Sequence, residues 1–155
     1  MPLKKRKMLT YKFYKNTKDI TELEINETVK FLHQHLDEFG DEAEDIKKCV
    51  DYALTIDHGK GGFILHAFHE GKLAGVLIMN NTGMSGFIPE NILVYIAVDA
   101  QYRGQGFGAA IIKEAIKHTK GNVKLHVEYE NPAKRLYERL GFTSKYAEMR
   151  FENNK

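Results

Sequence analysis

Residues 92–109 read ILVYIAVDAQYRGQGFGA. The first seven are almost all apolar, which predicts a central strand that is covered on both faces. Three alternating glycines then lead into an apolar-periodic segment, which predicts a helix from about 106 to 118. A glycine-rich turn from a strand into a helix leaves backbone N–H groups open to a ligand at the positive end of the helix dipole. A phosphate or pyrophosphate suits that position, and Arg103 can add a charge-assisted contact.

The rest of the chain supplies a mixed set of elements around this stretch. Alternating or apolar runs predict strands at 10–14, 63–69, 72–79, 92–98, 123–127 and 142–151. Helical periodicity predicts helices at about 19–39, 41–56, 106–118 and 132–140, the first of them capped by Asp19 or Thr21. The turn Glu70-Gly71 predicts a hairpin, and the strand–helix–strand unit around the glycines should be parallel. The predicted order is β-α-α-β-β-β-α-β-α-β, a mixed α/β (α+β) domain.

The length and composition indicate one domain and give no sign of nucleic-acid binding, membrane insertion or secretion. A length of 155 residues suits a single domain, residues 1–155, in which 1–9 form a loose basic tail that carries Lys4 to Lys7. The net charge of +2 gives no reason to expect nucleic acid. Since no apolar run approaches the roughly 18 residues of a membrane span, and no signal peptide is visible, we expect a cytoplasmic protein without a membrane partner. The single cysteine, Cys49, reads as a structural thiol.

The glycine turn has more than one interpretation from its spacing alone. A nucleotide P-loop requires G-x-x-x-x-G-K-[ST], which is absent. A dinucleotide fingerprint, G-x-G-x-x-G/A, fits Gly104 to Ala109, and Glu128 follows about 20 residues later, as that fingerprint asks. However, the chain after Gly108 supplies only two strands and one helix, too few for that fold.

Two motifs together give a more specific reading. Residues 103–108 match R-x-x-G-x-G, and 101–106 match Q-x-x-G-x-G. Residues 133–142, AKRLYERLGF, match A-x-x-L-Y-E-x-x-G-F. In this order, with one strand between them, they resemble the GNAT superfamily of N-acetyltransferases, most closely from Ile92 to Phe142. The resemblance implies a GNAT-like fold: a central, mixed, mostly antiparallel sheet with splayed middle strands and helices on both faces.

The resemblance also implies acetyl-CoA as the acyl-donor cosubstrate and assigns residues to it. The pantetheine arm would pair with the backbone of Ile96, Ala97 and Val98. The pyrophosphate would lie on Arg103, Gly104, Gln105, Gly106, Phe107, Gly108 and Ala109. Asn131 stands one residue nearer to Tyr137 than the family pattern places its asparagine, so it either contacts the cofactor or caps the helix that begins at Pro132.

Tyr137 matches the family tyrosine that lies near the thioester sulfur, which implies that it protonates the departing thiolate. An ordinary tyrosine, with a pKa of about 10, holds its proton at neutral pH. The amine must lose a proton, yet residues 92–98 contain no acid, which departs from part of the family.

Candidate bases therefore come from neighbouring segments. They are Glu90, His126, Glu128 and Glu130, of which His126 and Glu128 should share one face of the strand 123–127. Nothing resembles an activated serine or cysteine, so we expect direct transfer in a ternary complex. The spacing of the histidines predicts no metal site.

The resemblance thus implies an N-acetyltransferase that acts on a primary amine of a small molecule, a peptide or a protein, in a chain that forms a homodimer as family members often do. Two alternatives remain: a non-catalytic acyl-CoA-binding sensor or partner module, and a dinucleotide-binding protein. One acidic run has two interpretations: it attracts cationic amines, or it is an ordinary solvated helix face. It consists of Asp37, Glu38, Asp41, Glu42, Glu44 and Asp45.

Overall fold

Five strands form one sheet in the order β1-β2-β3-β4-β5, in a computed structural model that describes residues 8–57 and 59–154. The strands span Thr10–Tyr14, Gly62–His69, Lys72–Asn81, Asn91–Val98 and Val123–Leu125. Neighbours are antiparallel except for β4 and β5, which are parallel. The predicted hairpin and the predicted parallel unit are therefore confirmed. The basic run from Lys4 to Lys7 lies outside the described residues.

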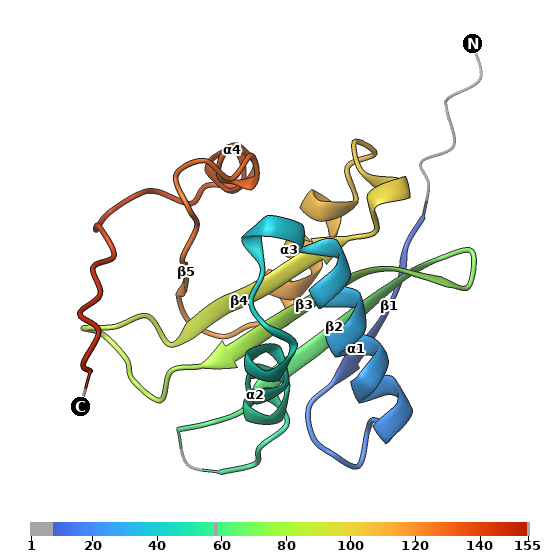
Figure 1. Ribbon diagram of the computed structural model, residues 1–155, viewed down its shortest axis with the longest axis horizontal. Coiled ribbons are helices and arrows are strands. Elements are labelled where there is room, and N and C mark those ends of the chain that lie inside the picture. The colour runs from blue at the N-terminus through green and yellow to red at the C-terminus, as the bar shows by residue number, and fades with distance from the viewer. Residues whose placement is uncertain (1–7, 58, 155) are drawn as a thin grey trace. The chain divides into compact units, whose positions relative to one another are not determined.

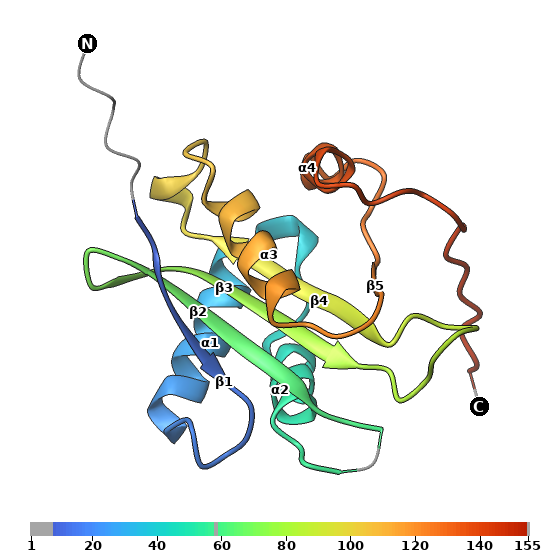
Figure 2. The ribbon, with the colours of Figure 1, turned by 180° about the vertical axis from the view of Figure 1, so that it is seen from behind.

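Helices cover both faces of this sheet, as predicted. α1 (Glu22–His35) and α2 (Ala43–Ala53) lie on one face, and α3 (Phe107–Lys117) lies on the other (Figure 1; Figure 2). Short 3-10 turns, η1 (Asp37–Phe39) and η2 (Ala100–Tyr102), precede α2 and α3.

α1 is shorter than the predicted helix at 19–39. It begins after Thr21, whose hydroxyl accepts from the Glu24 N–H at 3.1 Å while the Glu24 carboxylate accepts from the Thr21 N–H at 3.0 Å. This reciprocal capping box fixes the start of the helix. α1 ends at His35 because Asp37 adopts a φ of 55°, which an α-helix does not tolerate.

Two apolar layers hold the helices on the sheet. Side chains of β2, β3 and β4 pack with α1 and α2. The buried members of this cluster include Tyr14, Leu32, Ile46, Val50, Ile64, Val76, Ile78 and Tyr95. On the other face, Ile111 and Ile112 of α3 are fully buried. Gly75 of β3 allows this close approach, because a Cβ there would lie 2.4 Å from Ile111 Cδ1.

A bulge in β4 opens the sheet beside β5. Ile78 of β3 pairs with Tyr95, but the next residue, Met79, pairs with Leu93, so Val94 bulges out of the ladder. A bulge bends its strand. β4 accordingly pairs with β5 only through residues 91–93, and its remainder has no strand neighbour on that side among the described residues. This is the predicted splay.

Two strand predictions were wrong. β5 ends at Leu125 rather than Val127, so His126 and Glu128 share no strand face. The reason is that pairing of β4 with β5 stops at Leu93 and Leu125, where the bulge at Val94 interrupts the regular geometry of β4. Residues 142–151 also form no strand in the described chain, so the predicted order loses its last element. Side-chain alternation makes a strand only where a neighbouring backbone can pair with it.

The chain divides into two compact units, of which the first ends at Leu125 and the second begins at His126. The sheet and α1 to α3 belong to the first unit. The second contains α4 (Ala133–Arg139) and the segment after it. Within the described residues, no helix is both long and apolar enough to cross a membrane.

Candidate functional site

The turn between β4 and α3 is built around two glycines in the left-handed region. Gly104 and Gly106 have φ values of 79° and 82°, which cost an ordinary L-residue roughly 1–2 kcal/mol. A Cβ built on either glycine would meet no atom within 4 Å. The backbone conformation therefore selects glycine at both positions, and the space beside them is open.

Gly108 needs a different explanation. It is the second residue of α3, where glycine is less favourable than alanine by up to about 1 kcal/mol. The Ala110 N–H donates to the Gly106 carbonyl at 3.2 Å, so the N–H groups of Phe107, Gly108 and Ala109 precede the helical ladder and have no acceptor within it. A glycine at position 108 places no side chain beside these three donors, which suits the close approach of an anion.

Aromatic contacts hold both sides of this turn. Phe107 is 3% exposed, and its ring centroid lies 5.4 Å from that of His69 and 5.8 Å from that of Tyr102. Tyr102 ends η2 and Phe107 begins α3. Because both ends are packed against each other, the donors of the turn are preorganised for a ligand.

Arg103, the cation predicted beside the turn, is tied to α1. Its Nη2 donates to the His35 carbonyl at 2.6 Å, and its Nε donates to the Val98 carbonyl at 3.4 Å. The guanidinium thus lies at the C-terminal end of α1, where the helix dipole favours a cation. A contact from Arg103 or the exposed Gln105 to a pyrophosphate stays a prediction.

The end of β4 offers an open backbone edge next to the turn. Ile96, Ala97 and Val98 pair with β3 on one side, whereas pairing with β5 stops at Leu93. An open strand edge presents N–H and C=O groups that suit an extended, amide-containing chain. The structure therefore brings the predicted pantetheine and pyrophosphate residues together in the first unit.

Tyr137 lies in α4 of the second unit and is 8% exposed. Its ring packs edge to face on Phe142, with centroids 5.9 Å apart. Burial raises the pKa of Tyr137 to about 12, so the phenol keeps its proton at neutral pH.

The other predicted residues of the second unit lie before α4. The Asn131 carboxamide oxygen accepts from the Ala133 N–H at 2.9 Å, a contact of the kind that the capping alternative requires, and a contact of Asn131 with the cofactor stays a prediction. His126, Glu128 and Glu130 are exposed in the irregular segment that follows β5.

Glu90 is the one predicted base in the first unit. Its carboxylate accepts from the Asn122 N–H at 2.5 Å, and this hydrogen bond lowers the pKa of the Glu90 carboxyl. The lower pKa makes Glu90 a weaker base than an ordinary glutamate.

Comparison with known proteins identifies the family of the chain. Residues 20–142 match the Acetyltransferase (GNAT) family. The chain belongs to the GNAT acetyltransferase family. The 5-NmdU N-acetyltransferase of Pseudomonas phage PaMx11 is 32% identical over 102 residues, which cover 64% of this chain and 70% of that relative.

Solved GNAT structures share the fold at lower identity. A GNAT family acetyltransferase from Streptococcus pneumoniae TIGR4 superposes with a TM-score of 0.67 and 21% identity, covering 96% of this chain and all of that one. The ribosomal-protein-S18-alanine N-acetyltransferase of Escherichia coli gives a TM-score of 0.61 with 19% identity, covering 90% of this chain and 80% of its own. The predicted GNAT resemblance and fold are confirmed.

GNAT membership overturns the dinucleotide alternative. That fingerprint belongs to a mostly parallel, doubly wound sheet. Here β3 is antiparallel to both of its neighbours, β2 and β4, and β4–β5 is the one parallel pair of the described sheet.

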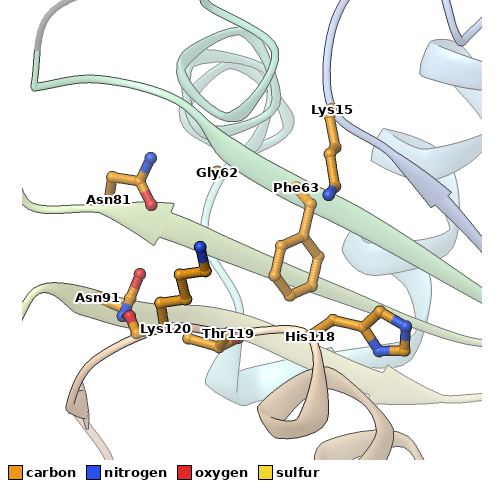
Figure 3. Close-up of a pocket in the computed structure, with 8 residues that line it drawn as sticks. All are labelled: Lys15, Gly62, Phe63, Asn81, Asn91, His118, Thr119 and Lys120. Atoms are coloured by element: carbon orange, nitrogen blue, oxygen red, sulfur yellow. The ribbon is translucent and has the colours of Figure 1, made fainter.

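A cavity of about 190 Å³ lies beside Asn91, at the start of β4 (Figure 3). It is lined by Lys15, Gly62, Phe63, Asn81, Asn91, His118, Thr119 and Lys120. Asn91 begins β4, whereas the turn follows Val98. The Asn91 side chain donates to the carbonyls of Lys120 and Asn122, so it fixes the loop after α3 to the start of β4. The cavity is therefore separate from the turn that suits a pyrophosphate.

Sequence reasoning missed one contact on β4. Tyr95 donates its hydroxyl proton to the Asp41 carboxylate, which comes from the connection between η1 and α2. Fifty-four positions separate the two residues, so no local pattern could pair them. The available signal was a single tyrosine in an otherwise aliphatic strand.

Proposed function

We propose that this GNAT protein transfers the acetyl group of acetyl-CoA directly to a primary amine in a ternary complex. The observation that carries the proposal is that the open edge at the end of β4 is followed, after η2, by the glycine turn and the N-terminus of α3. An extended amide chain that ends in a pyrophosphate fits this succession of groups. Family membership supports the same donor.

The residues of the first unit fit acetyl-CoA by their chemistry. Ile96, Ala97 and Val98 would hold the pantetheine amides, and the N–H groups from Gly104 to Ala109 would hold the pyrophosphate. Bound there, acetyl-CoA supplies an activated acetyl thioester. A backbone N–H near Val98 would stabilise the negative charge that develops on the carbonyl oxygen.

Tyr137 would act as a hydrogen-bond donor to the departing sulfur. With a pKa of about 12, its phenol is a weaker acid than a thiol of ordinary pKa near 8.5, so full proton transfer to the thiolate would be uphill. Stabilisation of the developing charge by the O–H group needs no complete transfer. His126 or Glu128 would accept the proton of the amine.

The names of relatives indicate which acceptor amines should be tested first. The PaMx11 relative is named for 5-NmdU and shares 32% identity, so 5-NmdU is the first acceptor to test. Polyamines, aminoglycosides, amino acids, peptide N-termini and protein lysines complete the panel.

The test measures release of free CoA from acetyl-CoA with each amine, together with mass spectrometry of the product. Transfer to at least one amine, with a mass gain of one acetyl group, is the expected result. Tight acetyl-CoA binding without transfer to any amine would instead support the non-catalytic sensor or partner module.

A further inference from the structure

The last residue of α1 lies against the segment that joins β4 to the glycine turn. His35 packs its ring on Phe31 of the same helix, with centroids 4.5 Å apart, and its side chain is 10% exposed. It contacts residues 99–103, which contain η2 and lead directly to Gly104. α1 therefore ends against the stretch of chain that positions the turn.

His35 contacts this segment through three separate groups. Its Nδ1 accepts a hydrogen bond from the Ala100 N–H at 3.3 Å. Its Nε2 lies 3.7 Å from the Asp99 Oδ2, and its backbone carbonyl accepts from the Arg103 Nη2 at 2.6 Å. Because these contacts reach both ends of the segment, one residue at the end of a helix holds the whole connection in place.

The hydrogen bond from Ala100 assigns the tautomer of the imidazole. An N–H donor requires a lone pair on Nδ1, so the ring proton of neutral His35 lies on Nε2, which faces the Asp99 carboxylate. That carboxylate is itself oriented, because its Oδ1 accepts from the Gln101 N–H at 3.0 Å. One ring nitrogen thus accepts a hydrogen bond, and the other faces a negative charge.

The Nδ1 acceptor completes the start of η2, and η2 packs on the start of α3. Ala100 is the first residue of η2, where an N–H has no acceptor within the helix. His35 supplies that acceptor from another element. At the other end of η2, the Tyr102 ring packs against Phe107, the first residue of α3, with centroids 5.8 Å apart. A continuous series of contacts therefore runs from His35 to the N–H donors of the glycine turn.

We propose that His35 is a positioning residue for acetyl-CoA, whose Nδ1 fixes η2 and thereby the three donors at the start of α3. This assignment rests on the proposed function, because it concerns the cofactor site of that reaction. His35 acts through Ala100 and Tyr102 and requires no contact of its own with the cofactor. The affinity for acetyl-CoA should therefore depend on the acceptor at Nδ1 and not on the aromatic ring that carries it.

Two substitutions separate the acceptor from the ring. His35→Asn keeps an acceptor, since the asparagine Oδ1 can take the place of Nδ1, but it loses the ring contact with Phe31. His35→Phe keeps a ring against Phe31 and loses the acceptor. Both variants retain the backbone carbonyl that accepts from Arg103, so the comparison isolates the side-chain hydrogen bond.

Calorimetric titration gives the Kd for acetyl-CoA, and steady-state kinetics give its KM and the kcat. For His35→Phe we expect a Kd and a KM roughly three- to tenfold higher, the effect of one lost hydrogen bond, with kcat within about twofold. For His35→Asn we expect a Kd within about twofold of the wild type, although its melting temperature falls. The control is His33→Phe, in the same last turn of α1 at an exposed position, which should leave Kd and kcat unchanged.

A merely structural role would follow the ring and not the acceptor. Binding that weakens more in His35→Asn than in His35→Phe would therefore overturn the assignment. If His35→Phe does not fold, nitrogen-15 NMR of the wild-type imidazole decides the matter: we expect the proton of the neutral ring on Nε2, and a proton on Nδ1 would overturn the assignment equally. Failure of the wild-type protein to bind acetyl-CoA would defeat the proposed function itself, whereas wild-type binding with an equal Kd in His35→Phe would defeat only the role of His35.

Discussion

Replacing Gly108 with alanine should stabilise the protein and weaken its binding of acetyl-CoA. Gly108 is the second residue of α3 and adopts helical conformation. An alanine there gains about 0.5–1 kcal/mol of helix propensity. For a domain of this size, that gain corresponds to a rise in melting temperature of about 1–4 °C.

If a pyrophosphate binds the N–H groups of Phe107, Gly108 and Ala109, the same methyl group would crowd it and lengthen one of these hydrogen bonds. Loss of one hydrogen bond to a charged phosphate oxygen costs about 1.5–3 kcal/mol, which is a roughly 10- to 150-fold weaker Kd. Thermal unfolding without ligand and calorimetric titration with acetyl-CoA measure the two effects separately.

Gly86→Ala is the matched control for this pair of measurements. Gly86 lies in the loop before β4 with a φ of 79°, and a Cβ there would meet no atom within 4 Å. Its replacement should cost about 1–2 kcal/mol of stability and leave the Kd for acetyl-CoA unchanged. A Gly108→Ala protein that binds acetyl-CoA as tightly as the wild type would refute the assignment of the pyrophosphate to the start of α3.

Three further outcomes follow from individual side chains. His66 is 2% exposed, and burial lowers its pKa from 6.5 to about 4, so folding disfavours its charged form. About 3 kcal/mol of the free energy of unfolding should therefore be lost as the pH falls from 6.5 to 4. His66→Gln should flatten this pH dependence in a series of urea-unfolding measurements. Thr21→Ala removes the cap of α1 and should lower the free energy of unfolding by about 1 kcal/mol without altering the Kd for acetyl-CoA; a changed Kd would contradict the separation of the two regions. Tyr137→Phe should lower kcat roughly 10- to 100-fold with little change in the KM for acetyl-CoA, and unchanged turnover would remove its proposed role.

Local chemistry made the fold largely predictable. The apolar run 92–98 and the glycines after it fix β4, the turn and α3, because each follows from backbone preferences within a few residues. The capping pair Thr21 and Glu24 works over the same short range. The end of β5 was not predictable in this way, because it depends on a bulge at Val94 of a different strand.

The same distinction between local and long-range determinants applies to the residues of the site. The donors at the start of α3 are visible in the sequence because Gly108 stands in the first turn of a helix, where glycine is less favourable than alanine. The Tyr95–Asp41 contact was invisible, since it joins a strand to a connection 54 residues away. Similarly, Arg103 could be recognised as a cation beside the turn, but its hydrogen bond to the His35 carbonyl depends on where α1 ends.

The central claim, that the turn between β4 and α3 binds acetyl-CoA, is tested most directly by thermal unfolding of the wild-type protein with acetyl-CoA, free CoA or NAD. At about 100 times its Kd, a ligand of the native state adds roughly 2.7 kcal/mol of stability, equivalent to a rise of several degrees in melting temperature. We predict this rise with acetyl-CoA and CoA and none with NAD. No rise with either CoA species, or a rise with NAD alone, would contradict the account.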